Sequence, residues 1–512
     1  MSSAKILVQG SARELKSQVA LRNVTSEAGR PAQVTAHRSP VTAVETELYA
    51  ADEKIYPRAV GGWFAVWRWL LVWATQIAFY GGAWLTWNGR QAVLFDIAHR
   101  KFYIFGLVFW PQDIIYLAVL LIIAALSLFL FTAVAGRLWC GYACPQTVYT
   151  EIFMWIERVI EGDRVKRMKL DRAPRSPRKL LLKSAKHAIW ILLSLWTGFT
   201  FVGYFTPIRE LSGLVMSVFT WAGGGPAPTL GPWETFWCLF YGFATYGNAG
   251  WMREQVCIYM CPYARFQSAM FDRDTLIITY DADRGEPRGA RAKSVDRAAR
   301  GLGDCVDCRI CVQVCPTGID IRDGLQYQCI GCAACIDGCD HVMDRMGYPR
   351  GLIRYSTQNA LERKFTRAQM LAHTFRARVL VYTGIVWAVI IAAAIGLYVR
   401  VPLKVDVIRD RAAISREVEG GDIENVYQLQ IINTSERGRV FDIEAMGLPT
   451  MHLDGETHVE LPGTGSRLVP LSVRVHVGPG AVAPGTHRIE FLVHAHDDPA
   501  VFVRETSIFI VR

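Results

Sequence analysis

The sequence predicts a multi-domain membrane protein with an α-helical transmembrane region of about five spans, a two-cluster bacterial ferredoxin-like segment and a C-terminal immunoglobulin-like β-sandwich. Three observations support this class. The 512 residues are 51% hydrophobic and 20% charged, below the ~25% charge of typical soluble domains. All 13 cysteines lie between Cys140 and Cys339. Residues 401–512 alternate apolar and polar positions between Gly/Pro turns, as short strands do.

Residues 1–60 are polar without a sustained period, which predicts a loosely ordered tail. Five apolar runs follow, and runs near 20 residues match a hydrocarbon layer of ~30 Å. The first four are expected to form two hairpins within residues 61–250, and the fifth to span 378–400; buried helices of a soluble protein are the alternative. In the first run, the long side chain of Arg68 is expected to reach the membrane interface. The runs are Trp63–Trp87, Ile114–Ala135, His187–Phe205, the short Trp233–Asn248, and Val379–Val399.

Basic residues predict the orientation. The loop 137–186 holds twelve Lys and Arg, whereas 88–113 holds three and 207–232 holds one. Because short cytoplasmic loops are enriched in Lys and Arg, the 137–186 loop is expected to be cytoplasmic. The N-terminus and the segment 251–377 then lie on the same side, and residues 401–512 on the other. The net charge of +10 comes without any base-reading motif, so nucleic acid is not an expected partner.

Two C-x2-C-x2-C-x3-C runs lie within about residues 295–345. This spacing is highly specific for two [4Fe–4S] clusters, with the fourth cysteine of each run ligating the other cluster. A zinc ribbon built from four of these cysteines is the alternative, but it leaves the other four unused. Asp340 follows the last cysteine where a proline is usual, which bears on the shape of that loop. The predicted ligand sets are Cys305, Cys308, Cys311 and Cys339 for one cluster, and Cys329, Cys332, Cys335 and Cys315 for the other.

The string C-x-Y-x-C-P occurs twice, once after the second span and once after the fourth. If each string continues its helix, thiols at i and i+4 share one face, and the repeat could bring four sulfurs together. Soft thiolates select Cu(I), zinc or iron–sulfur species, and Arg137 and Arg253, each about one turn from a thiol, are expected to favour thiolate. Structural packing is the alternative. The four candidate copper thiols are Cys140, Cys144, Cys257 and Cys261.

Other candidates are weaker. Cys238 inside the fourth span is best explained by packing. Only His187 could ligate haem from a span, and no phosphate-binding glycine motif is present, so haem b and bound nucleotide are not expected. His494 and His496 would share one face of a strand; solvated surface histidines are the simpler interpretation, and a copper site is the alternative.

The order of these parts resembles the cytochrome c oxidase accessory proteins of the FixG/RdxA/CcoG type over roughly residues 40–512. The resemblance implies a protein of the bacterial inner membrane that supports maturation of a copper–haem oxidase, with a proposed role in reducing Cu(II) to Cu(I). It implies two [4Fe–4S] clusters and copper as cofactors or substrate. The implied partners are an unidentified cytoplasmic electron donor, copper ions, oxidase subunits or assembly factors, and membrane lipid.

Three functions follow from the sequence. The first is an electron-transferring metalloreductase acting on copper. The second is a respiratory ferredoxin subunit that serves a membrane or periplasmic partner without copper chemistry. The third is an assembly scaffold in which the clusters are structural.

Overall fold

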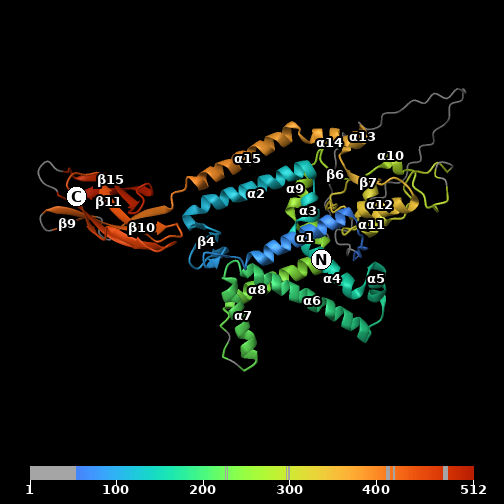
Figure 1. Cartoon of the computed structure of the whole chain (residues 1–512), viewed down its shortest axis with the longest axis horizontal. Helices are drawn as coiled ribbons and strands as arrows, with labels where there is room; N and C mark the ends of the chain where they lie inside the picture. Colours follow the sequence, from blue (N-terminus) through green and yellow to red (C-terminus); the bar gives the residue numbers. More distant parts are fainter. Residues whose placement is uncertain are drawn as a thin grey trace, which may run out of the picture. The chain divides into compact units, whose positions relative to one another are not determined.

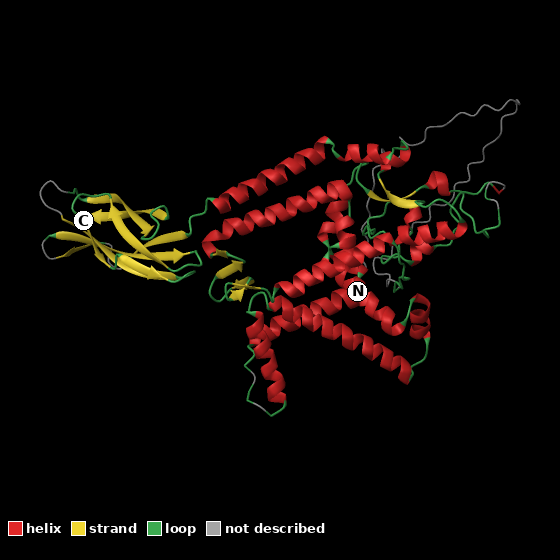
Figure 2. Cartoon of the chain, in the orientation of Figure 1, coloured by secondary structure: helices red, strands yellow, loops and turns green. Residues whose placement is uncertain are grey.

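The structure is a computed structural model that describes residues 54–512, apart from residues 225, 228, 296, 298–299, 411–414, 419–420, 477–481 and 512. The predicted tail 1–60 therefore lies mostly outside the described residues. Figure 1 labels the elements, and Figure 2 shows that the residues beyond α15 form strands and loops only.

Helices occupy all five predicted apolar runs. Among the described residues, three are long and apolar enough to cross a membrane: Pro111–Ala135, Pro177–Val202 and Ala377–Tyr398. α1 has 20 residues and α8 has 14, and neither combines enough length with enough hydropathy. Four tryptophans and Arg68 lower the hydropathy of α1. Five spans are therefore not shown. The helices are α1 (Trp63–Gly82), α2 (Ile114–Ala135), α6 (Pro177–Val202), α8 (Pro232–Thr245) and α15 (Ala377–Tyr398).

These helices pack in pairs. α2 and α15 run antiparallel, and the Tyr116 hydroxyl donates to the Gly396 carbonyl at 3.1 Å. α6 and α8 approach closely at Gly198, where an added Cβ would lie 2.2 Å from the Cys238 carbonyl oxygen. The backbone at Cys238 thus forms part of a helix contact, which agrees with a packing role for that residue.

The basic segment 137–186 is folded rather than an open loop. It contains short helices, and α6 begins at Pro177, ten residues before the predicted start. The Ser176 side chain accepts a hydrogen bond from the Lys179 amide at 3.2 Å and caps that helix. The short helices are α3 (Leu138–Tyr142), α4 (Pro145–Glu161) and α5 (Arg164–Arg172).

The segments that connect α1 to α2 and α6 to α8 also contain structure. Five short strands lie between α1 and α2, and α7 (Ile208–Ala222) precedes α8. Trp110, after the last of these strands, joins a small buried cluster with Ile432 of the C-terminal domain. The strands are β1 (Thr86–Trp87), β2 (Arg90–Gln91), β3 (Val93–Asp96), β4 (Lys101–Ile104) and β5 (Leu107–Phe109).

The cysteine-rich segment is bracketed by two antiparallel strands, β6 (Ile277–Tyr280) and β7 (Ile353–Ser356). Met343 and Leu352 lie in its buried core together with several cysteines. Its helices and those that lead to α15 are short except for α12. They are η3 (Tyr246–Met252), η4 (Val256–Met260), α9 (Pro262–Met270), α10 (Ala282–Gly285), α11 (Ile310–Gln313), α12 (Ala334–Met346), α13 (Gln358–Glu362) and α14 (Arg367–Thr374).

The C-terminal domain is a sandwich of two antiparallel sheets, with strand orders β12-β14-β10-β8, where β9 also pairs with β10, and β13-β11-β15-β16. Inward positions such as Phe441 and Phe491 are fully buried, which follows from the period of two along each strand. The predicted sandwich is confirmed. Its strands are β8 (Leu403–Arg409), β9 (Arg416–Val418), β10 (Asp422–Asn433), β11 (Arg439–Met446), β12 (Met451–Gly455), β13 (His458–Leu461), β14 (Ser466–His476), β15 (Gly485–Ala495) and β16 (Phe502–Val511).

Candidate iron–sulfur and thiol site

The two cysteine runs have the same backbone geometry. In the first run, the third and fifth positions, Asp307 and Arg309, have left-handed φ values of 50° and 52°. In the second, Gly331 and Ala333 have φ values of 71° and 59°. Left-handed conformations cost energy for residues with a Cβ and persist only where the surroundings require them. Such backbone turns present N–H groups toward an anion, so both loops fit a sulfur-rich cluster.

The fold brings each fourth cysteine to the other run. Burial raises the pKa of Cys339 to about 12, with further contributions from the charges of Cys311, Cys308 and Cys305. Burial also raises the pKa of Cys329 to about 12, and Cys332 and Cys315 add to it. The neighbours are therefore those of the crossed pattern. The assignment of ligands to clusters itself stays a prediction.

Burial keeps these sulfurs as thiols unless a cation is bound. The pKa of Cys332 rises to about 11 and that of Cys311 to about 12, so neither would ionise alone near neutral pH. A cluster iron supplies the missing positive charge, because a coordinating thiol is deprotonated outright. Among the described residues, no three metal-ligating side chains are already arranged to hold an ion.

The residue after Cys339 accounts for one difference between the runs. Pro316 follows Cys315 in a turn, whereas Asp340 follows Cys339 inside α12. A proline there would remove a helical N–H. The Asp340 carboxylate accepts a hydrogen bond from the Gly351 amide at 2.9 Å, which ties α12 to the chain leading into β7.

The two C-x-Y-x-C-P strings do not continue their helices. Cys144 has ψ 128° and Cys261 has ψ 108°, and each is the N-cap of the helix that begins at the following proline. The prediction of i and i+4 thiols on one continuous helix is therefore wrong. The reason is steric, because a proline disfavours the α-region for the residue before it. The Cys-Pro pairs in the sequence therefore predict that the helix does not continue through Cys144 or Cys261.

The strings nevertheless place their thiols near one another. Burial raises the pKa of Cys257 to about 12, and the charges of Cys144, Cys140 and Cys261 raise it further. Burial likewise raises the pKa of Cys140 to about 11, and its Sγ lies 3.3 Å from Gln267 Oε1. Thiols from both halves of the chain thus share one neighbourhood at the ends of α3 and η4.

This thiol group lies against the second cysteine run. Cys140 and Cys257 both pack on a buried cluster that contains Cys332. At Gly141, between the two cysteines of the first string, an added Cβ would lie 2.8 Å from the Cys332 Cα. The string and the run are therefore in direct backbone contact. The sequence predicted that both groups lie on the same side of the membrane, but it did not predict this contact.

Two arginines take unexpected partners. Arg68 is buried and donates from Nη1 to the Cys332 carbonyl at 2.7 Å, rather than extending to the interface. Arg137 donates to the carbonyls of Tyr327 and Ala264. It opposes the raised pKa of Cys140, but burial outweighs it, so the prediction of an easily ionised thiol there is wrong.

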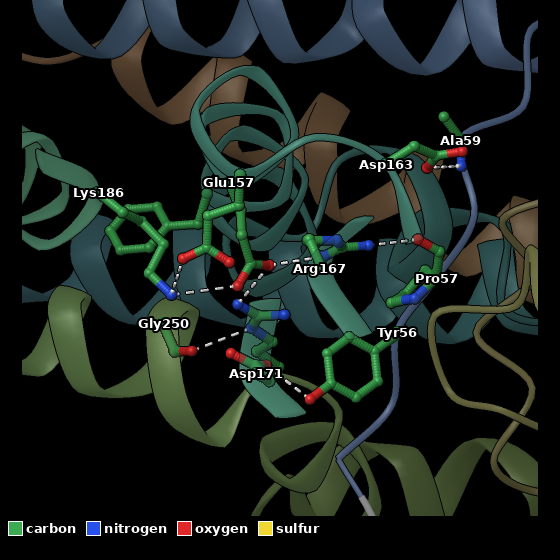
Figure 3. Close-up of polar contacts among 12 residues, drawn as sticks. Tyr56, Pro57, Ala59, Glu157, Asp163, Arg167, Asp171, Lys186 and Gly250 are labelled. Atoms are coloured by element: carbon green, nitrogen blue, oxygen red, sulfur yellow. Dashed lines mark hydrogen bonds and ion pairs between the residues drawn. The ribbon is translucent and has the colours of Figure 1, made fainter. Parts of the chain in front are cut away.

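The other predicted cation, Arg253, is held elsewhere. Its Nη2 lies 3.0 Å from Glu157, and the same carboxylate pairs with Arg167 at 2.7 Å and Lys186 at 3.4 Å. Figure 3 shows the contacts of Arg167 and Lys186 with Glu157, whose side chain is 1% exposed. Arg253 is therefore part of a buried ion-pair network.

The same network anchors the chain just before α1. Arg167 donates to the Pro57 carbonyl at 2.6 Å, and the Tyr56 hydroxyl donates to Asp171 at 2.6 Å (Figure 3). The Arg58 amide donates to the Gln313 carbonyl at 2.7 Å. Residues 55–60 therefore bridge α5 and the first cysteine run instead of continuing the expected loose tail.

These features define a membrane-anchored iron–sulfur protein with an Ig-like C-terminal domain, and comparisons with known proteins agree. Residues 252–358 match a family described as a 4Fe-4S dicluster domain, and residues 117–162 match a 4Fe-4S binding domain. Residues 393–512 match the IG-like fold at the C-terminus of FixG.

The chain belongs to the FixG/RdxA/RdxB family. It is 37% identical to the nitrogen fixation protein FixG of Rhizobium meliloti over 501 residues, which cover 90% of this chain and 93% of that protein. It is 39% identical to protein RdxA of Cereibacter sphaeroides over 431 residues, covering 81% and 87%. A crystal structure of a FixG-related protein from Vibrio parahaemolyticus covers 22% of this chain and 97% of its own, with 22% identity and a TM-score of 0.20.

Proposed function

We propose that this chain is an inner-membrane electron-transfer protein that reduces Cu(II) to Cu(I) and thereby supports assembly of a copper–haem cytochrome c oxidase. The observation that carries the proposal is the contact between the thiol group and the second cysteine run. Cys140 and Cys257 pack on the cluster that contains Cys332. Thiolates are soft ligands that hold Cu(I), so the site of reduction and the source of electrons are adjacent.

When bound, a [4Fe–4S] cluster supplies one electron at a time, which is the number that Cu(II) needs to become Cu(I). The chain's own residues position the reactants. A cavity of about 80 Å³ lies beside Cys257 of the thiol group, is lined in part by Cys332 and Glu151, and has room for several water molecules.

The positions of the two cysteine runs support a path for electrons from the protein surface to the thiol group. The second run contacts the thiols, whereas Cys308 of the first run is exposed to solvent. A cytoplasmic one-electron donor would dock at the first run. Oxidase subunits or assembly factors would contact the sandwich at the opposite end of the chain.

The proposal includes the number of membrane spans and their orientation. α1 and α8 would cross the membrane with α2, α6 and α15, giving five spans in a bacterial inner membrane. The Lys and Arg excess of residues 137–186 supports a cytoplasmic side for that segment, for residues 251–377 and for the N-terminus. Residues 401–512 would be periplasmic.

The test is a comparison of serine variants in detergent-purified, anaerobically reduced protein. Cys140→Ser, Cys144→Ser, Cys257→Ser and Cys261→Ser should each retain the iron of the wild type but lose oxidation by added Cu(II), because serine keeps the size without the soft ligand. Cys238→Ser is the matched control and should behave as wild type. Full copper reduction in all four variants would contradict the proposal.

A second function for the thiols has a specific observation in its favour. The first string lies inside the residues that match a 4Fe-4S binding domain, although that range holds only Cys140 and Cys144. The four thiols could hold a third cluster and relay electrons to a respiratory partner. Iron analysis separates the two: two cubes give about eight iron atoms per chain, and a third raises this to about twelve.

A further inference from the structure

The outer face of one sandwich sheet carries three histidines around a single carboxylate. Asp442 lies on the central strand β11, directly opposite His458 on β13 and His494 on β15. His496 follows two residues after His494, and its amide donates to the Val440 carbonyl, so it stays on the same sheet face. The three imidazoles therefore come from β13, from β15 and from the bend that follows β15, on both sides of Asp442.

The contacts converge on the two oxygens of that carboxylate. His458 Nδ1 bonds to Oδ1, and His496 Nδ1 lies 2.8 Å from Oδ2. His494 Nε2 lies 3.7 Å from the same Oδ2, too far for a hydrogen bond. Its Nδ1 is buried and has no hydrogen-bond partner. His494 is thus held beside the carboxylate with neither ring nitrogen in a hydrogen bond.

An ordinary surface ion pair does not need this arrangement. His476 with Asp422 and His99 with Asp96 each place one imidazole on one carboxylate, at 2.6 and 2.7 Å. At Asp442 two imidazoles already satisfy the carboxylate, and a third charged imidazole would repel the first two. The Nε2 of the third imidazole lies beside the carboxylate without a hydrogen bond, so it can bind another group.

We propose that His458, His494, His496 and Asp442 form a binding site for a divalent transition-metal ion. Imidazole and carboxylate are ligands that suit Cu(II) and Zn(II), and Cu(II) is the more tightly bound of the two. A metal beside Asp442 would be within reach of His494 Nε2, the ring nitrogen that lies nearest to that carboxylate. Histidine ligands are neutral, so Asp442 would supply the negative charge.

Ring rotation completes the site. Among the residues that the structure describes, no three side chains already surround one metal-sized point, so the imidazoles must turn from Asp442 toward a shared ion. The side chains of His458 and His496 are 74% and 71% exposed, which leaves both free to turn. His494, 24% exposed, is the fixed member. The site is independent of the cysteine thiols and of the proposed copper reduction.

The test uses the full chain without a polyhistidine tag, in a background in which the four string cysteines are serine, with the clusters oxidised. Titration with Cu(II) should give about one tightly bound ion per chain, with an EPR signal that shows nitrogen coupling from more than one imidazole. His458→Ala, His494→Ala and His496→Ala should each weaken binding by at least about tenfold.

His476→Ala, which removes the imidazole of a simple pair, is the matched control and should leave affinity and signal unchanged. Thermal unfolding of each variant checks that the sandwich remains folded. Absence of a nitrogen-coupled Cu(II) signal, or wild-type affinity in the His458 and His496 variants, would overturn the proposal. Failure of copper reduction in the cysteine variants does not bear on this result.

Discussion

Gly141 shows how a single residue controls the distance between the thiols and the second cysteine run. Its missing side chain lets α3 touch the backbone of Gly331 and Cys332, since an added Cβ would lie 2.7 to 2.8 Å from those atoms. No flexible side chain could move aside to relieve that contact, so any larger residue must push the two segments apart.

We therefore expect Gly141→Ala to slow the oxidation of reduced protein by Cu(II) while the four string cysteines remain intact. The measurement is stopped-flow bleaching of the cluster absorbance. Gly213→Ala is the matched control, because nothing lies within 4 Å of an added Cβ there. An unchanged rate would mean that the backbone contact does not limit electron transfer.

Arg68 places a buried positive charge beside the second run. Its guanidinium donates to the Cys332 carbonyl at 2.7 Å. Cluster potentials respond to nearby charge and hydrogen bonds, and a cation favours the more negative, reduced state. Arg68→Gln should lower the reduction potential of one cluster and leave the other near its wild-type value. EPR-monitored redox titration measures both, and Arg350→Gln, at an exposed pair with Asp344, is the control. Equal shifts in both clusters would contradict this interpretation.

At the scale of elements, Glu157 joins α4 to α5, α6 and the turn after η3. Its carboxylate pairs with Arg167, Lys186 and Arg253, and all four side chains are at most 8% exposed. Buried ion pairs add little net stability when complete, but removing one partner leaves uncompensated charge. The network therefore fixes the position of these elements more than it stabilises the fold.

Glu157→Gln should destabilise the protein by about 3–5 kcal/mol, because the buried Arg167 and Arg253 lose their shared anion, while Lys186 keeps Glu161 at 2.9 Å. The check is thermal or denaturant unfolding in detergent. Glu456→Gln, at a half-exposed pair with Arg467 in the sandwich, should have little effect. Equal stability of the two variants would show that water or other carboxylates compensate the cations.

At the scale of the whole chain, the open question is the number of spans. Three helices meet the length and hydropathy of a membrane span among the described residues, and α1 and α8 do not. If all five cross, the C-terminal sandwich lies opposite the cysteine-rich segment. If only α2, α6 and α15 cross, the basic residues 137–186 and the cysteine-rich segment would lie on opposite sides of the membrane.

Reporter fusions near residues 170 and 320 should both read cytoplasmic, and one after residue 433 should read periplasmic, as the basic loop predicts. A fusion in the segment between α1 and α2 tests separately whether α1 crosses the membrane, and this fusion should read periplasmic. A cytoplasmic reading after residue 433, with a periplasmic reading near residue 320, would mean that α8 does not cross the membrane.

The sequence by itself determined what depends on local spacing. The two C-x2-C-x2-C-x3-C runs indicated iron–sulfur clusters, and the alternation of residues 401–512 indicated the sandwich, because both are patterns of a few consecutive residues. The predicted helices on the apolar runs were found for the same reason. The interruption of the helix at Cys144 and at Cys261 is also a local effect, because the proline that follows each cysteine predicts it.

Only the tertiary structure decided which distant groups meet. The contact of Gly141 with Cys332, the capture of Arg253 by Glu157 and the gathering of three histidines at Asp442 each join residues far apart in the chain. Burial also decided the ionisation of Cys140, since the desolvation of its thiol outweighs the nearby Arg137. Spacing along the chain specifies neither strand register between distant segments nor the depth at which a charge is buried, and these set the chemistry of both sites.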